Sequence, residues 1–180
     1  MKGVIFTEFL EMVESQFGYQ TVDRILGEAR LASGGSYTAV GTYDHGELVQ
    51  LVANLHGASG IAVPELIRAY GRYIFKHFTS HHAAFFSRVG NTFDFLESID
   101  GHIHVEVHKL YPDAELPRFE SSRPGPDRFV LTYRSTRPFA DLAHGLIESS
   151  VEHFGESIEI LRENLDEAGT HTRFVLTKAA

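Results

Sequence analysis

The stretch DGHIHVEVHKLYP (Asp100–Pro112) divides the chain into two parts with different patterns. Before it, apolar residues recur every three or four positions, as they do in amphipathic helices. After it, short apolar runs typical of strands flank one further helical segment. The sequence therefore predicts an α+β protein, with a helical first part and a mixed second part that contains an antiparallel sheet.

The histidine stretch itself fits two local structures. Its apolar residues Ile103, Val105 and Val107 alternate with polar ones, and this alternation favours a strand. The residues Ile103, Val107 and Leu110 equally form an apolar stripe with helical spacing. A strand would put four polar side chains on one face: His102, His104, Glu106 and His108. On a helix, His104 and His108 lie one turn apart and could share a metal.

Helices are expected through the first part of the chain. The first ends at Gly18 after apolar residues spaced by four, namely Ile5, Phe9, Val13 and Phe17. Thr21 is expected to cap the second helix, and Asp44 with Glu47 forms a capping box for the third. The fourth begins at Pro64 and turns Leu66, Ala69, Tyr70, Tyr73 and Ile74 inward.

The second part predicts a strand over 128–137 (RFVLTYRSTR), a helix over 139–155 and a hairpin that joins 156–164 to 172–178. SSRPGPD (121–127) is the most flexible-looking connection. On the strand, Tyr133, Ser135 and Arg137 project from one face. Two hydroxyls and a guanidinium could hold a carboxylate or phosphate, and a solvated polar face explains them equally well.

Composition excludes several classes of chemistry. The chain has no cysteine, so disulfides, thiolate catalysis and cysteine-ligated metals are ruled out. A net charge of −8 argues against nucleic acid or an anionic membrane as partner. Acidic residues interrupt the apolar N-terminus and no run of 18 apolar residues exists, so we expect neither a signal peptide nor a membrane span. A cytoplasmic location is the default expectation.

Taken together, the histidine stretch and the Tyr-x-Ser-x-Arg pattern resemble the haem-nitric oxide/oxygen binding (H-NOX) family, which is related to the haem domain of soluble guanylate cyclase. The resemblance runs over essentially the whole chain, from MKGVIFTEFLE through RAYGRYIF, FDFLESIDGHIHVEVHKLYPDAELPRF and YRSTRPFADLAHGLI to RFVLTK. It implies one domain over 1–180, with a helical lobe at about 1–60, a haem-cradling remainder at about 61–180, and haem b buried between them.

The resemblance also implies roles for particular residues. His104 matches the histidine that binds the haem iron, and Tyr133, Ser135 and Arg137 match the clamp for the haem propionates. Pro117 matches a proline that packs on the haem. Many members place an aspartate three residues before the histidine, whereas Asp100 lies four before His104, which leaves His102 as a runner-up. The histidine segment is then expected to be a helix.

The resemblance further implies a gas sensor. Oxygen-binding members carry a distal tyrosine, and the matching position here is Leu142, among further apolar distal residues: Ile5, Phe9, Ile74, Phe78 and Leu146. His144 is expected to face elsewhere. We therefore expect ferrous haem that binds nitric oxide and carbon monoxide but excludes dioxygen. Because no catalytic domain is attached, we expect a sensor that is not an enzyme and that regulates a separate histidine kinase, diguanylate cyclase or phosphodiesterase.

Two other classes remain as alternatives. One is a zinc hydrolase that uses His102, His104 and Glu106 as its metal site. The other is an interaction domain without a cofactor. The visible absorption of the purified protein distinguishes them, because only the haem protein is red-orange.

Overall fold

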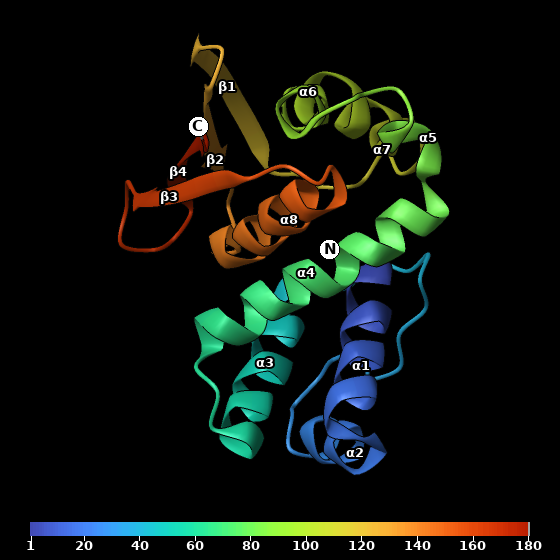
Figure 1. Ribbon diagram of the computed structural model, residues 1–180. Helices are drawn as coiled ribbons and strands as arrows, with labels where there is room; N and C mark the ends of the chain where they lie inside the picture. The colour runs from blue at the N-terminus through green and yellow to red at the C-terminus, as the bar shows by residue number, and fades with distance from the viewer. Residues whose placement is uncertain (180) are drawn as a thin grey trace.

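The computed structural model describes residues 1–179. Figure 1 shows its helices and strands, which follow in this order: α1 (Val4–Phe17), α2 (Tyr19–Gly27), α3 (His45–Ser59), α4 (Val63–His81), α5 (Ala83–Phe86), α6 (Thr92–Ser98), the π-helix η1 (Ile99–Ile103), α7 (His104–Leu110), β1 (Arg118–Gly125), β2 (Arg128–Arg134), α8 (Ala140–His153), β3 (Ile158–Asn164) and β4 (His171–Lys178). The α+β class is confirmed.

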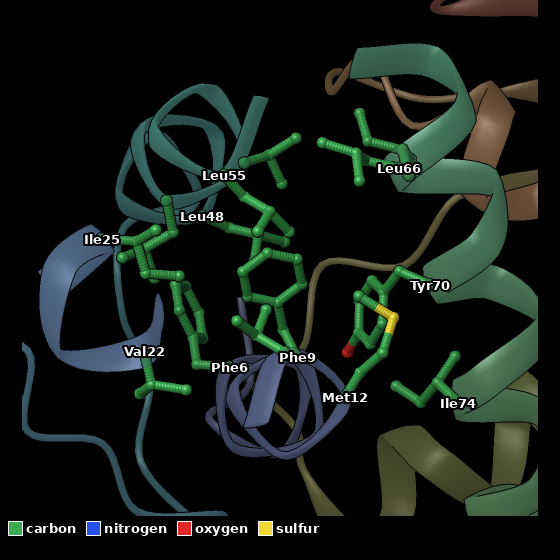
Figure 2. Close-up of a cluster of buried hydrophobic side chains, with 14 of the residues drawn as sticks. Phe6, Phe9, Met12, Val22, Ile25, Leu48, Leu55, Leu66, Tyr70 and Ile74 are labelled. Atoms are coloured by element: carbon green, nitrogen blue, oxygen red, sulfur yellow. The ribbon is translucent and has the colours of Figure 1, made fainter. Parts of the chain in front are cut away.

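A first hydrophobic core joins α1, α2 and α3 to the first half of α4 (Figure 2). On α1, Phe6 and Phe9 have no exposed surface, and Phe6 stacks on Tyr37 from the loop before α3. The expected helix end at Gly18 is confirmed, since this residue has a φ of 84°, which glycine adopts without strain. Burying these large aromatic side chains provides the main force that holds the helices together.

The second core lies between α8 and the sheet. The four strands are antiparallel in the order β1-β2-β4-β3, and the predicted hairpin of β3 with β4 is confirmed. The inner face of the sheet presents residues without exposed surface, namely Phe129 and Leu131 on β2 with Phe174 and Leu176 on β4. The helices α4, α6 and α8 contribute the other side of this core.

Helices α4 and α8 lie side by side between the two cores (Figure 1). Two glycines allow this close approach. A Cβ atom at Gly71 would lie 2.4 Å from the carbonyl oxygen of Leu142, and one at Gly145 would lie 2.1 Å from that of Arg68. Glu148 of α8 accepts hydrogen bonds from Arg68 and Arg72 of α4, and these bonds also hold the two helices together. None of the helices within residues 1–179 combines the length and apolarity needed to cross a membrane.

Several local expectations need correction. The histidine stretch is helical, so the strand suggested by its alternation is wrong. Thr21 does not cap α2 but lies inside it, where its hydroxyl donates to the carbonyl of Phe17. Asp44 does cap α3, whereas Glu47 bonds to Ser33 instead of completing a capping box.

Two further corrections concern the sheet. The segment 121–127, expected to be a flexible connection, largely belongs to the edge strand β1, which contains a register shift between Ser122 and Gly125. The strand expected over 128–137 ends at Arg134. Ser135 and Arg137 therefore do not alternate with Tyr133 along a strand. The backbone turns after Arg134, and the amide of Ser135 bonds to the carbonyl of Thr170.

Candidate functional site

A cavity of about 350 Å³ lies where the helical part meets the sheet. Its walls come from α1, α4 and α8 on one side, and from η1, α7 and the segment that leads into β1 on the other. Ten of the residues singled out in the sequence line it: Ile5, Ile74, Phe78, His104, Pro117, Tyr133, Ser135, Arg137, Leu142 and Leu146. Phe9 does not line the cavity. It lies behind this wall with its ring 5.3 Å from that of Tyr70.

His104 is the first residue of α7 and faces the cavity together with the helical stripe Ile103, Val107 and Leu110. Its side chain is 16% exposed, and its Nδ1 lies 3.2 Å from a carboxylate oxygen of Asp100. The same oxygen accepts a hydrogen bond from the amide of Phe119 at 3.3 Å. Burial lowers the pKa of His104, although the bond to Asp100 opposes that shift. The imidazole is therefore held neutral, which is the form that binds metals.

The other two histidines of the stretch have different surroundings. His102 lines no part of the cavity, and its Nε2 lies 3.2 Å from the guanidinium of Arg88. His108 is exposed. Within residues 1–179, no three His, Cys, Asp or Glu side chains gather as a metal site. The zinc hydrolase reading, which needs His102, His104 and Glu106 around one ion, is accordingly not favoured.

A polar end of the cavity is formed by Tyr133, Ser135 and Arg137. The Tyr133 hydroxyl donates to the carbonyl of Arg137 at 3.0 Å, and the Arg137 amide donates to the Ser135 hydroxyl at 3.1 Å. These two bonds fold the segment into a compact turn. The Arg137 side chain is only 12% exposed, and its guanidinium binds the carboxylate of Glu115, which is itself 73% exposed. The turn thus already holds a carboxylate at the rim of the cavity.

The N-terminus closes the same rim. Lys2 donates to the Thr42 hydroxyl at 2.8 Å, lies 3.3 Å from the Asp113 carboxylate, and stands 4.8 Å over the ring of Tyr111. These contacts connect the start of the chain to the segment that follows α7. The N-terminal amine lies nearby, where burial and then the positive charge of Arg137 lower its pKa. The side-chain cations of the rim, Lys2 and Arg137, are thus each paired with a carboxylate, of Asp113 and Glu115 respectively.

The wall opposite His104 is apolar. Helices α1, α4 and α8 supply Ile5, Ile74, Phe78, Leu142 and Leu146 to it. His144 is on α8 but does not line the cavity, and its ring packs 5.5 Å from that of Phe174 in the sheet. The cavity thus has the partly buried imidazole of His104, an apolar wall and a carboxylate-binding rim, and the exposed His82 lies at its edge. This combination fits a flat apolar ring system with carboxylate tails, such as haem.

Comparison with known proteins agrees with this geometry. The sequence profile of the Haem-NO-binding family matches residues 2–162. A comparison with curated proteins found no match. Among solved structures, the Fe(II) unliganded H-NOX protein from K. algicida is 37% identical over 100% of this chain and 97% of that chain, with a TM-score of 0.95.

Two further structures show the same fold. The IWP-051-bound H-NOX from Shewanella woodyi in the Fe(II)CO state is 42% identical over 99% of this chain and 95% of that one, with a TM-score of 0.85. The H-NOX protein from S. oneidensis in the Fe(II)NO state is 24% identical, covers 100% of both chains and has a TM-score of 0.89. The class that emerges is a haem-binding gas-sensor domain. The chain belongs to the Haem-NO-binding, or H-NOX, family.

Sequence reasoning missed two partners of the candidate residues. Asp100 was noted only for its spacing, yet it contacts His104 directly. On a helix these residues lie one turn apart, so the helical alternative contained this signal. Glu115 binds Arg137 from a loop 22 positions earlier in the chain, and no sequence pattern announces that contact.

Proposed function

We propose that this protein is a sensor of nitric oxide that binds ferrous haem b in the cavity and excludes dioxygen. The observation that carries the proposal is one cavity lined by a partly buried imidazole and by apolar side chains, with a carboxylate-binding arginine at the rim. Bound ferrous haem would supply an iron with one open coordination position for a diatomic gas.

In this proposal His104 is the iron ligand. The contact with Asp100 favours the tautomer in which Nδ1 carries the proton, so Nε2 keeps a free lone pair. Because Asp100 also accepts from the amide of Phe119, the ring is tied to the start of β1 as well as to its own helix. The helical stripe around His104 would pack against the ring system. Pro117, which also lines the cavity, would contact it too.

The polar turn would bind the propionates. The Arg137 guanidinium can form two parallel bonds to one carboxylate, and its present partner Glu115 is exposed enough to be displaced. The hydroxyls of Tyr133 and Ser135 can turn from the backbone of Arg137 to a propionate oxygen. Both the charge and the location of the turn support this role.

The apolar wall would select the gas. Dioxygen accumulates negative charge when it binds ferrous iron and needs a hydrogen-bond donor nearby, whereas nitric oxide needs none. Leu142 and Leu146 face the cavity from α8, and Ile5, Ile74 and Phe78 face it from α1 and α4. None of these five side chains can donate a hydrogen bond.

The proximal helix would pass on the signal. His104 would hold the iron from the first residue of α7, so a change in that bond when nitric oxide binds would move α7 relative to the helical lobe. Such a change is a shift between two populated states of the protein. By family resemblance the receiver is a separate histidine kinase or an enzyme of cyclic-di-GMP metabolism.

The visible spectrum of the reduced, haem-loaded protein tests this proposal. We expect a five-coordinate spectrum that stays unchanged in air and shifts when carbon monoxide or nitric oxide is added. A protein that takes up no haem, or a spectrum that converts to a stable new form in air, would contradict it.

A single substitution tests the selection step. Leu142→Tyr places a phenol on the wall opposite His104, and one hydrogen bond to a charged acceptor contributes roughly 1.5–3 kcal/mol. We therefore expect an increase in dioxygen affinity of about ten- to a hundredfold, measured by titration of the ferrous protein. Leu142→Phe is the matched control, because it adds a ring without a hydroxyl. An equal increase in both variants would mean that shape, not hydrogen bonding, excludes dioxygen.

A further inference from the structure

A buried tyrosine joins two of the three helices that form the apolar wall of the cavity. Tyr70 lies on α4 with 1% of its surface exposed, and its hydroxyl donates to the backbone carbonyl of Ile5 on α1 at 2.6 Å. Figure 2 shows the phenol reaching from α4 toward α1, with its oxygen next to that helix. The ring also packs edge-on against Phe9, with 5.3 Å between the ring centroids. The hydroxyl is thus held by both packing and hydrogen bonding.

The acceptor of this bond has a direct connection to the cavity. Ile5 lines the cavity with its side chain while its carbonyl accepts from Tyr70. On the donor side, Ile74 lies one turn after Tyr70 on α4 and also lines the cavity. The bond therefore connects two parts of the apolar wall that belong to different helices. Tyr70 does not itself line the cavity.

The Tyr70 hydroxyl stays protonated near neutral pH and so remains available as the donor of this bond. Burial raises the pKa of Tyr70 well above its usual value, with the charge of Glu8 adding to the shift, so the phenol stays protonated. A buried phenol without an acceptor would lose its hydration and gain nothing in return. Simple satisfaction of a buried polar group would account for the bond alone. That explanation does not account for the position of the acceptor, which is the carbonyl of Ile5, a residue of the first turn of α1 that lines the cavity.

We propose that Tyr70 is a positioning residue for gas binding, which holds Ile5 in place in the cavity wall through this hydrogen bond. The inference rests on the proposed haem site. Without the bond, the first turn of α1 would be free to move away from the cavity, and the cavity would open more often. Tyr70 thereby limits the rate at which diatomic ligands enter, although it never touches them.

The test compares two variants that each remove one hydroxyl from the same helix. Tyr70→Phe removes the donor but keeps the ring. Tyr73→Phe removes a hydroxyl three residues further on, from a partly buried residue that does not line the cavity. In the haem-loaded ferrous protein, we expect the rate constant of carbon monoxide association after flash photolysis to rise about fivefold in Tyr70→Phe, as one lost hydrogen bond implies. Tyr73→Phe is expected to match the wild type.

A second modification covers the case in which Tyr70→Phe does not fold. Replacement of Tyr70 by 3-fluorotyrosine makes the phenol a stronger donor at nearly constant shape, and association is then expected to slow. Unchanged association in a haem-loaded variant, or the same change in the Tyr73 control, would overturn the role of Tyr70. Failure of the wild-type protein to bind haem would instead overturn the proposed function.

Discussion

The two walls of the cavity are built very differently. The wall formed by α1, α4 and α8 is closely packed, since Phe9 and Ile74 have no exposed surface and glycines bring α4 and α8 into contact. On the opposite side, η1 and α7 contain no fully buried residue, and Leu110 is 67% exposed. Segments with few buried contacts open and shift most easily. The difference places rigidity on the side that would select the gas and mobility on the side that would signal.

The π-helix contributes to this mobility. It spans Ile99–Ile103, between α6 and the residue that begins α7. π-helical turns are rare and are frequently found at functional sites. Here the turn lets Asp100 reach the imidazole of His104 and the amide of Phe119 at once. Asp100 thus links the proximal segment to β1, while only partly buried side chains of that segment, Ile99 and Ile103, pack against the second core.

Removal of the proximal imidazole should have the largest effect. His104→Gly is expected to abolish ligation of the iron by the protein, while His102→Ala and His108→Ala keep a ferrous spectrum close to that of the wild type. The reason is that only His104 of the three lines the cavity. Added imidazole should restore a ligand to His104→Gly. Loss of the ligand in His102→Ala would instead assign the iron to the runner-up.

Truncation of the rim should weaken haem retention by a smaller amount. Arg137→Ala removes a charge-assisted bond worth roughly 1.5–3 kcal/mol, whereas Ser135→Ala removes a neutral bond worth about 1 kcal/mol. Transfer of haem to a scavenger apoprotein should therefore be faster from Arg137→Ala than from Ser135→Ala. Equal transfer rates would show that the rim does not hold propionates as proposed.

A third substitution tests the rigidity of the selecting wall. Gly145→Ala forces a methyl group against the backbone of Arg68, so we expect a loss of roughly 1–3 kcal/mol in the free energy of unfolding. Gly57→Ala is the matched control on α3, because a Cβ there meets nothing within 4 Å. It should be neutral or slightly stabilising. Denaturant titration of both apoproteins measures the difference, and equal stabilities would mean that α4 and α8 can separate at little cost.

Much of this architecture could be predicted from the sequence, because long helices and the β3–β4 hairpin have strong apolar periodicity. The histidine stretch could not be assigned from its residues alone, since alternation and a helical stripe coincide there and a π-turn has no periodicity signal. The edge strand β1 was missed for another reason. Its residues are mostly exposed, so no apolar pattern marks them, and backbone pairing with β2 alone makes them a strand.

The candidate site also contains some residues that the sequence predicts and some contacts that it does not. The sequence motif identifies residues such as Tyr133 and Arg137, and the structure places them at one cavity. Their roles remain predictions. Contacts between distant segments, such as the bond from Tyr70 to Ile5, depend on how the helices pack and leave no local pattern. The family resemblance predicts Phe9 among the cavity residues, but Phe9 does not line the cavity and its ring packs against that of Tyr70.

Hydrogen exchange of the haem-loaded ferrous protein, with and without nitric oxide, tests the central claim most directly. If one wall selects and the other signals, nitric oxide should increase amide exchange in residues 99–110, where release of His104 loosens η1 and α7. Exchange in α4 and α8 should stay unchanged. Increased exchange in α4 and α8, with residues 99–110 unaffected, would contradict the account.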